Sequence, residues 1–292
     1  MTTSQDATSL SAAAGTADPL DALKRNGFAI LEDVLPTELT ADLAAVCDRV
    51  YQSLTRAPGI DPLHLVGCLD RDEKLIELID APRPLSVIRR ALDDDVYVYW
   101  SHLDVHPPVP DPSVGALTLG WHQDFESITK AMPALNSPLS VKVGFYLSDV
   151  VEIEDGPMYV LPGTHAMSLR PADVDPHADG VPVLMRAGSA VVFDHRLWHG
   201  RGRNHAQRAR KAVFLAYAFR WIRPRHHLRF DEAFVRQLSP TRRQLLDVLL
   251  PGEPLDPRQM SDGHKDVGRG DGERYHDPKP VDIPLRDVPL AS

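Results

Sequence analysis

The sequence predicts an α+β protein whose core is an antiparallel β-sandwich or barrel preceded by helices. Helix signals concentrate before residue 95, and short β-branched and aromatic segments follow it, separated by Pro, Gly and Asp. Proline accounts for 26 of the 292 residues, about 9% against about 5% in an average protein, which disfavours long helices. Hydrophobic residues form 43% of the chain, enough for a sizeable core.

The helix signals lie in the first third of the chain. Asp18 followed by Pro19 is typical of a helix start, and Asn26-Gly27 is typical of a helix end. Between Leu39 and Leu54, apolar residues recur at helical spacing. The elements predicted before residue 95 are helices at 19–26, 36–54, 72–80 and 84–92, and a strand at 28–31.

Strand signals follow residue 95. Residues 96–100 are β-branched or aromatic, which favours a strand. In the stretch 139–147, Val, Phe and Leu alternate with polar or small residues, so one apolar face is expected to pack on outer helices. Lys142 then faces either the barrel interior or solvent. The other predicted elements are strands at 157–161, 189–194 and 211–221 and a helix at 240–250.

We expect a single domain over residues 18–250. Residues 1–17 are small and polar and are predicted to be a disordered tail, and the polar, proline-rich residues 251–292 are predicted to be a second tail. The start lacks the charged and apolar regions of a secretory signal, and no apolar run reaches the roughly 18 residues of a membrane helix. The sequence therefore predicts a cytoplasmic protein with no membrane partner.

Charge and cysteine content narrow the possible functions. The formal net charge of −9 disfavours a nucleic acid or an anionic membrane as the main partner. Two cysteines, Cys47 and Cys68, are too few for a disulfide framework or a cysteine zinc site. A basic run at 220–227 could bind an anionic substrate group, although a solvated charge run is the favoured interpretation. We therefore expect the protein to act on a small molecule, which could be anionic.

The pattern His-x-Asp occurs four times. On an extended strand its two side chains share one face, and with a distant third histidine they can bind one face of an iron(II) ion. Such a triad leaves coordination positions open for a cosubstrate and dioxygen. The four pairs are His102/Asp104, His122/Asp124, His177/Asp179 and His264/Asp266.

Sequence context separates the four pairs. The pair at 264/266 lies in the polar tail, and the pair at 177/179 lies in an Asp/Pro-rich stretch expected to be a loop. His102/Asp104 sits on a predicted strand and remains a contender. His122/Asp124 follows the hydrophobic stretch 117–121, so it lies at the end of a predicted strand and is favoured as the metal pair.

Five segments together resemble the phytanoyl-CoA dioxygenase family. Residues 120–126 (GWHQDFE) resemble its WHQD signature, and residues 155–165 (DGPMYVLPGTH) resemble its conserved turn. Residues 197–200 (LWHG) resemble the second metal segment, and residues 210–213 (RKAV) resemble the segment with the cosubstrate arginine. The pattern GFAILEDVLP at 27–36 also fits, and the order and spacing of the segments agree.

This resemblance implies a double-stranded β-helix, which is a jelly-roll, cupin-like core flanked here by N-terminal helices. It implies Fe(II), 2-oxoglutarate as cosubstrate, and O2. His122, Asp124 and His199 are then the iron ligands and catalytic residues, and Arg210 binds the distal carboxylate of 2-oxoglutarate. A guanidinium suits that role because it pairs with a carboxylate through two parallel hydrogen bonds.

Neighbouring residues offer alternatives to two of these assignments. His195 lies four residues before His199 and could be the ligand in its place. Arg208 and Lys211 compete with Arg210, although Lys211 is expected to point the opposite way on an extended strand.

The chain partly resembles the ectoine hydroxylase branch of the family. It departs from that branch at Ile128-Thr129 and at Arg201, where a serine is usual, so ectoine itself is a doubtful substrate. Asp104 replaces an asparagine that contacts the cosubstrate, and an inward Lys142 would suit the cosubstrate or an acidic substrate. Asp104 and Lys142 are therefore candidate cofactor-binding residues.

The predicted activity is a non-haem Fe(II)- and 2-oxoglutarate-dependent dioxygenase that hydroxylates an unactivated C–H bond of a small molecule, in specialised or accessory metabolism. The same iron chemistry can desaturate, cyclise, epimerise or form an endoperoxide, and these reactions are the alternatives. Halogenation is disfavoured because Asp124 fills the position where chloride would bind. A jelly-roll binding protein without catalysis is a remote alternative.

Overall fold

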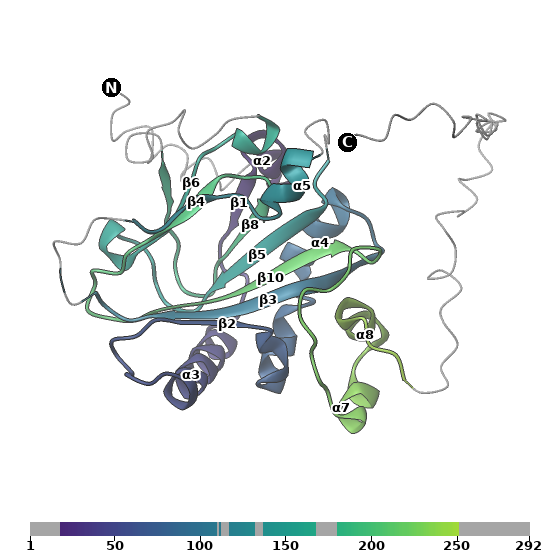
Figure 1. Cartoon of the computed structure of the whole chain (residues 1–292). Helices are drawn as coiled ribbons and strands as arrows, with labels where there is room; N and C mark the ends of the chain where they lie inside the picture. The colour runs from purple at the N-terminus through teal and green to yellow at the C-terminus, as the bar shows by residue number, and fades with distance from the viewer. Residues whose placement is uncertain (1–17, 110, 112–116, 132–136, 168–179, 251–292) are drawn as a thin grey trace, which may run out of the picture. The chain divides into compact units, whose positions relative to one another are not determined.

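Two antiparallel β-sheets form the centre of the molecule in a computed structural model (Figure 1). The structure describes residues 18–109, 111, 117–131, 137–167 and 180–250. The predicted tails and the pairs at 177/179 and 264/266 lie outside these residues.

A six-stranded sheet has the order β1-β8-β5-β10-β3-β2, and a four-stranded sheet has the order β4-β9-β6-β7. All described neighbouring strands pair antiparallel. The strands are β1 Phe28–Leu31, β2 Leu63–Val66, β3 Val96–His106, β4 Leu117–His122, β5 Ser140–Tyr146, β6 Met158–Val160, β7 Val181–Val183, β8 Ala190–Asp194, β9 His199–Gly202 and β10 Arg210–Phe219.

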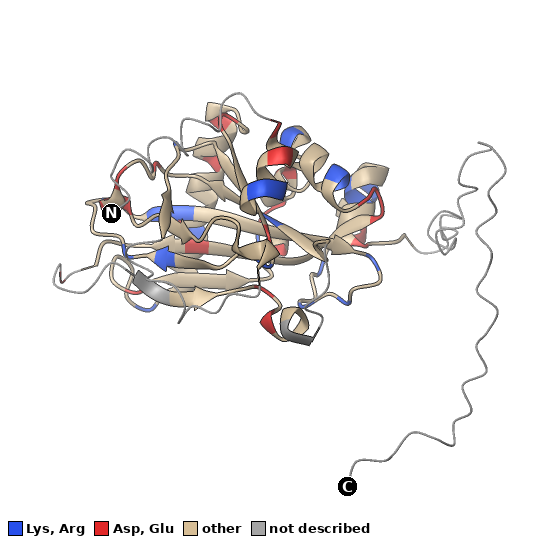
Figure 2. Ribbon diagram, turned by 90° about the horizontal axis from the view of Figure 1, so that it is seen from above, with Lys and Arg blue, Asp and Glu red and all other residues tan. Residues whose placement is uncertain are grey.

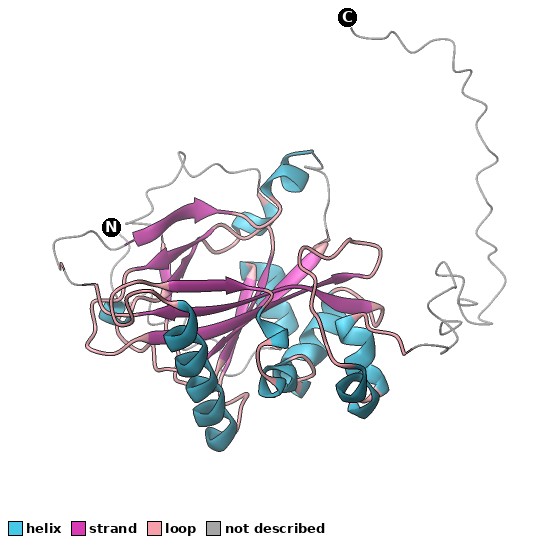
Figure 3. Ribbon diagram, turned by 60° about the horizontal axis from the view of Figure 1, so that its bottom comes forward, coloured by secondary structure: helices cyan, strands magenta, loops and turns pink. Residues whose placement is uncertain are grey.

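Helices cover the outer side of the six-stranded sheet (Figures 1 and 3). The described helices are α2 Pro19–Asn26, α3 Thr37–Leu54, α4 Pro82–Ala91, α5 Glu126–Ala131, α7 Glu232–Gln237 and α8 Pro240–Leu246, and the 3-10 turns are η2 Cys68–Asp70, η3 Glu73–Leu78, η4 Ile153–Asp155 and η5 Thr164–Ala166. Among the helices of the described ranges, none has the length and apolar character to cross a membrane.

The first helix shows how local sequence sets an element. The Asp18 carboxylate accepts a hydrogen bond from the Leu20 N–H at 3.0 Å, and Pro19 occupies the first helical position. Gly27 ends the helix in the left-handed region, with φ of 83°, a conformation that favours glycine. These contacts confirm the helix predicted from the Asp-Pro and Asn-Gly signals.

The strand β5 separates two hydrophobic cores. Its side chains Val141, Val143 and Phe145 belong to the outer core, which the helices α3, α4 and α8 complete. Tyr146 belongs to the inner core between the two sheets, together with residues of β6, β7 and β8. The predicted alternation of 139–147 is therefore confirmed, and of its two options for Lys142 the buried, inward one is observed.

Some predicted elements differ from the structure. The segment 72–80 forms the 3-10 turn η3 in place of an α-helix, and α8 ends at Leu246 because Asp247 adopts a left-handed conformation with φ of 53°. Sequence patterns missed β2, β7, β9, α5 and α7, which contain only three to six residues each. Such short segments hold one or two periods of any pattern, too few to be distinguished from loops.

The two cysteines belong to the outer core. Both are free thiols with no exposed surface, and burial raises the pKa of Cys47 and of Cys68 to about 12. The expectation that the chain lacks a disulfide framework is therefore confirmed for the described residues.

Charged residues of both signs lie mainly on helices and loops, but some lie within the strands (Figure 2). Those in the strands include the buried residues Asp104, Lys142 and Arg210. Burying a charge costs free energy unless it is paired, so each of these residues must have partners inside the protein.

We predict that Gly144→Ala destabilises the fold. A Cβ at Gly144 would lie 2.4 Å from the Phe214 ring, which itself stacks on His102. The ring would have to move within a packed interior, and the free energy of unfolding should fall by about 1–3 kcal/mol, measured by urea denaturation. Gly120→Ala is the control, because no atom lies within 4 Å of a Cβ at that position. Equal stability of both variants would contradict this packing.

Candidate metal centre

The strands β4 and β9 bring two histidines together. His122 is the last residue of β4 and His199 the first of β9, and the two are direct cross-strand partners. Their ring centroids lie 4.1 Å apart. Asp124 follows two residues after His122, and one ligand atom from each of the three residues lies within 4.8 Å of the others. The predicted triad therefore forms one group.

The chain reverses immediately after Asp124. Phe125 has a positive φ of 54°, which is uncommon for a residue other than glycine, and α5 begins at Glu126. The Phe125 ring stacks on Tyr99 with centroids 5.2 Å apart, and the side chain of Gln123 donates to the backbone carbonyl of Arg196. These contacts fix the loop and place the carboxylate of Asp124 beside the imidazoles.

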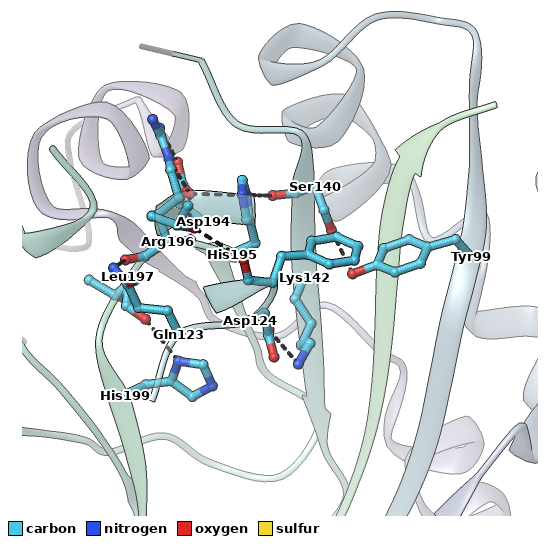
Figure 4. Close-up of polar contacts among 12 residues, drawn as sticks. Tyr99, Gln123, Asp124, Ser140, Lys142, Asp194, His195, Arg196, Leu197 and His199 are labelled. Carbon is cyan, nitrogen blue, oxygen red and sulfur yellow. Dashed lines mark hydrogen bonds and ion pairs between the residues drawn. The ribbon is translucent and has the colours of Figure 1, made fainter. Parts of the chain in front are cut away.

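A bidentate ion pair fixes the segment that leads into β9. The Asp194 carboxylate accepts from Arg196 Nε at 3.0 Å and from its Nη2 at 2.7 Å, and both residues are buried. The same carboxylate accepts from the Arg196 backbone N–H at 2.8 Å. The tight turn between β8 and β9 therefore sets the position at which His199 begins its strand (Figure 4).

Both imidazoles of the group are prepared to bind a metal through Nε2. Nδ1 of His199 lies 2.9 Å from the Leu197 carbonyl, and Nδ1 of His122 lies 3.3 Å from the Gly120 carbonyl. A carbonyl only accepts, so each Nδ1 carries the proton and Nε2 keeps its lone pair. Burial lowers the pKa of His122 and lowers that of His199 to about 3, so both rings are neutral at physiological pH.

The carboxylate of the group is ionised. Burial alone would raise the pKa of Asp124, but the charge of Lys142 and the neighbouring His199 outweigh it and hold the pKa well below its usual range. The Lys142 ammonium lies 2.6 Å from the Asp124 carboxylate (Figure 4). Two neutral imidazoles and one carboxylate are a donor set that suits a divalent first-row metal.

Arg210 lies inside the sheet pair, as the alternation along β10 predicts. It is buried, and its guanidinium donates to the Gly156 carbonyl. Lys211 points the other way and pairs with Asp48 of α3 at 2.6 Å. Arg208 is half-exposed and pairs with Asp155 at 3.1 Å. The two competing cations therefore lie on other faces of the chain.

The turn at Asp155-Gly156 supports Arg210. The Asp155 carboxylate accepts from the backbone N–H groups of Val151 and Glu152 at 2.9 and 3.0 Å. Gly156 has a φ of 73°, and a Cβ there would lie 2.8 Å from the backbone of Arg203. The glycine in this motif is therefore required by backbone conformation and by close packing, and its carbonyl orients the arginine.

His195 lies outside the group of three ligands. Its Nδ1 lies 3.1 Å from the Ser140 carbonyl, and its ring meets the edge of Phe125 with centroids 5.8 Å apart (Figure 4). His165 contacts the Lys24 carbonyl through Nε2 at 3.1 Å and is therefore a hydrogen-bonding loop residue.

Asp104 is surrounded by imidazoles. Its Oδ1 lies 2.7 Å from His64 Nδ1 and 3.2 Å from His102 Nδ1, and its Oδ2 lies 3.8 Å from His106 Nε2. The contact of Asp104 with the cosubstrate stays a prediction. His64 and His106 are not among the predicted site residues, because β2 was not predicted and His106 ends a strand that was expected to stop earlier.

The basic run after β10 is partly ordered against aromatic rings. The Arg225 guanidinium lies 4.6 Å from the Trp100 ring centroid and 5.9 Å from that of Phe125. Its backbone N–H donates to the Tyr99 carbonyl at 3.0 Å. Arg220 instead pairs with Asp247 at 2.7 Å. One cation of this run therefore lies close to the loop that carries Asp124.

Comparison with known proteins decides the family. The model of the phytanoyl-CoA dioxygenase (PhyH) family matches residues 23–212, about two-thirds of the chain. The chain belongs to this family. The matched range includes His122, Asp124, His199 and Arg210. The resemblance found in the sequence is confirmed, and the prediction of iron, 2-oxoglutarate and O2 is confirmed at the level of the family.

Two relatives are similar to this PhyH-family chain in sequence over most of their length. The uncharacterized protein Rv1501 of Mycobacterium tuberculosis is 28% identical over 273 residues, covering 88% of this chain and 90% of the relative. The ectoine dioxygenase of Nocardia farcinica is 25% identical over 240 residues, covering 68% of this chain and 76% of the relative.

Two solved structures show the same fold. HygX of Streptomyces hygroscopicus, with nickel and 2-oxoglutarate bound, matches with a TM-score of 0.58 at 15% identity and covers 73% of this chain and 90% of its own. The epimerase SnoN of nogalamycin biosynthesis matches with a TM-score of 0.53 at 16% identity, and the match covers 72% of this chain and 83% of SnoN.

We predict one iron(II) per chain at this group. His122→Ala, Asp124→Ala and His199→Ala should each weaken iron binding by more than about 100-fold, because loss of a mere outer hydrogen-bond partner already costs 10–100-fold. Anaerobic equilibrium dialysis with metal analysis measures this loss. His195→Ala and His102→Ala are the controls and should keep iron. Retention by His122→Ala together with loss by His102→Ala would show that the wrong His-x-Asp pair was assigned.

Proposed function

We propose that this protein is an Fe(II)- and 2-oxoglutarate-dependent dioxygenase that hydroxylates an unactivated C–H bond of a small molecule. One observation carries the proposal. Two neutral imidazoles and an ionised carboxylate converge inside a pair of sheets that also encloses a buried arginine. A facial triad with open positions is the donor set of non-haem iron oxygenases.

The fold that supports this function is a double-stranded β-helix. The strand orders β3-β10-β5-β8 and β4-β9-β6-β7 form two facing four-stranded sheets, to which β1 and β2 add at the edges of the larger one. The inner core lies between them, and β4 and β9 carry the two histidines at its rim. The likeness to HygX and SnoN supports this assignment.

Each protein residue at the centre has a separate task. His122, Asp124 and His199 would hold iron on one face, which leaves the opposite positions for cosubstrate and dioxygen. When bound, the iron supplies the oxidative chemistry that 2-oxoglutarate drives, giving succinate and carbon dioxide. The protein holds the reactants in position and excludes water.

Arg210 would bind the distal carboxylate of 2-oxoglutarate. The Gly156 carbonyl accepts from one guanidinium nitrogen, and this contact orients the planar fork. A buried guanidinium has lost its hydration, so an incoming carboxylate gains a strong charge-assisted pair.

Lys142 would provide a second cation for the cosubstrate. It is buried on β5, and its charge acts on His102 as well as on His122 and His199. An ammonium in that position can neutralise a carboxylate bound at the metal. Asp104 remains the third candidate for contact with the cosubstrate, and its oxygens face the imidazoles of His64, His102 and His106.

The substrate would bind against the partly exposed aromatic rings of Trp100 and Phe125. Phe125 directly follows the ligand Asp124, and the Arg225 guanidinium covers the face of Trp100. Such a surface suits a small molecule that carries an apolar part and an anionic group.

We propose hydroxylation in preference to the other reactions that an iron- and 2-oxoglutarate-dependent centre can perform. Asp124 supplies a carboxylate where a halogenating enzyme would bind chloride, so halogenation is not proposed. Desaturation, cyclisation, epimerisation and endoperoxide formation need the same metal centre. An epimerase and a carbocyclase, both from nogalamycin biosynthesis, are among the solved structures of this fold, so product analysis must distinguish the outcomes.

The proposal is tested by turnover. The full chain, loaded anaerobically with iron(II), should convert 2-oxoglutarate to succinate in the presence of O2, and a candidate substrate should accelerate this and gain 16 mass units of one oxygen atom. His199→Ala is the matched control. If the iron-loaded protein forms no succinate with any member of a broad substrate panel, a non-catalytic binding role is favoured.

We predict that Arg210→Ala raises the apparent 2-oxoglutarate constant by about 30-fold or more, because losing one partner of a buried charge-assisted pair costs about 2–5 kcal/mol. Iron binding should stay nearly unchanged. Arg210→Lys should recover part of the loss, since lysine lacks the forked geometry. Steady-state kinetics in 2-oxoglutarate measure the effect.

Lys211→Ala and Arg208→Ala serve as controls, because both cations pair with carboxylates elsewhere. They should behave like the unmodified protein. A cosubstrate defect in Arg208→Ala with none in Arg210→Ala would mean that the arginine has been misassigned.

A further inference from the structure

A second His-x-Asp pair gains a third ligand in the structure. His102 and Asp104 lie on β3, and the neighbouring strand β2 places His64 directly opposite Asp104. One ligand atom from each of these three residues lies within 4.8 Å of the others. This His64 cluster (His64, His102 and Asp104) shares no residue with the centre of His122, Asp124 and His199.

The two imidazoles of the His64 cluster meet at one oxygen atom. His64 Nδ1 lies 2.7 Å and His102 Nδ1 lies 3.2 Å from the same Oδ1 of Asp104. In a tetrahedral zinc site, with ligand bonds of about 2.0–2.1 Å, neighbouring ligand atoms lie about 3.3 Å apart. The edge of 2.7 Å would therefore have to open by about 0.6 Å, and the edge of 3.2 Å by about 0.1 Å, for an ion to enter.

Packing holds these ligands in place before any ion binds. The His102 ring stacks on Phe214 with centroids 4.7 Å apart and planes 12° apart, and it contacts the His64 ring at 4.6 Å. Asp104 is buried on the same strand. A ligand set whose rings and carboxylate are already oriented loses little freedom when it binds a metal.

The protonation states also suit a cation. Burial opposes ionisation of Asp104, but the electrostatic interaction with His102 and the hydrogen bonds donated by His102 and His64 outweigh it and hold the pKa well below its usual range. Burial lowers the pKa of His102, so its ring is neutral at physiological pH. An ionised carboxylate only accepts, so Nδ1 of His64 and Nδ1 of His102 each carry the ring proton in the metal-free protein. An ion that binds at these atoms takes the place of the two protons, which move to Nε2 of each ring or to solvent.

His64 gives the cluster a path to solvent. Half of its side chain is exposed, whereas His102 and Asp104 are almost fully buried. An ion could enter past His64 and keep water as a fourth ligand. His106 is a poor fourth ligand, because its Nε2 is 2.8 Å from Arg201 Nη1 and accepts that hydrogen bond.

We propose that His64, His102 and Asp104 form a second metal site, which binds a zinc-class divalent cation and ties the edge strand β2 to β3. Two imidazole nitrogens, one carboxylate oxygen and one water match the ligand types and number of zinc. This site is independent of the proposed oxygenase activity. Its function would be structural, because it links β2 to β3, the strand that also pairs with the strand of Arg210.

Metal counting on the full chain tests the second site. The chelator-treated protein is saturated with zinc, freed of excess metal, and analysed for zinc per chain. The unmodified protein should hold two, because the triad at His122 also accepts zinc. His64→Ala should hold one, His199→Ala one, and the double variant none. Tetrahedral cobalt(II) absorption in the His199→Ala background should be present and should vanish when His64→Ala is added.

Controls separate a metal site from a hydrogen-bonded network without metal. Asp104→Asn keeps the shape of the side chain but removes its charge, and it should lose the second zinc while remaining folded by circular dichroism. His227→Ala removes an exposed histidine outside the cluster and should keep both ions. One zinc in the unmodified protein, or two in His64→Ala, would overturn the proposal whether or not the protein forms succinate.

Discussion

The register between β4 and β9 determines the geometry of the candidate metal centre. His122 and His199 face each other across this pair of strands, and a slip of one residue would turn one imidazole to the opposite face of the sheet. Contacts outside the ladder secure the register. Gln123, which follows β4, donates to the Arg196 carbonyl, and Arg196 is itself held by Asp194 at the end of β8. One arginine therefore fastens the ends of three strands around the centre.

Buried charge explains why polar residues gather inside this sheet pair. Asp104 and Asp124 are carboxylates that water would otherwise solvate, and each remains ionised only because cationic or hydrogen-bonding partners surround it. The partner of Asp124 is the ammonium of Lys142, and the partners of Asp104 are imidazoles. The buried guanidinium of Arg210 also needs a hydrogen-bonding partner, and it finds one in the backbone carbonyl of Gly156. Pairs of buried charged or hydrogen-bonding side chains therefore determine the structure of the interior as much as its apolar residues do.

The His122/Asp124 pair could be favoured from local sequence because it lies at a strand end. His199 and Arg210 were assigned through the family resemblance, and strand alternation added only that Lys211 points away from Arg210. The direction of Lys142 could not be settled from alternation alone, since only its partner on another loop shows that it faces inward. His64 was missed for a similar reason. Its strand has four residues, and its role depends on pairing with β3, a contact 40 residues away in sequence.

The pair of Lys142 and Asp124 has a consequence for the order in which ligands bind. Without metal, the ammonium neutralises the carboxylate, and the cation and anion satisfy each other. If Asp124 bound a divalent ion, the ammonium of Lys142 would lose its partner and could attract an anion. Binding of the metal would then raise the affinity for the anion, and linkage would require the effect to be mutual. The pair of Lys142 and Asp124 would therefore make metal and cosubstrate bind cooperatively. The 2-oxoglutarate dianion would bind mainly to protein that already holds the metal.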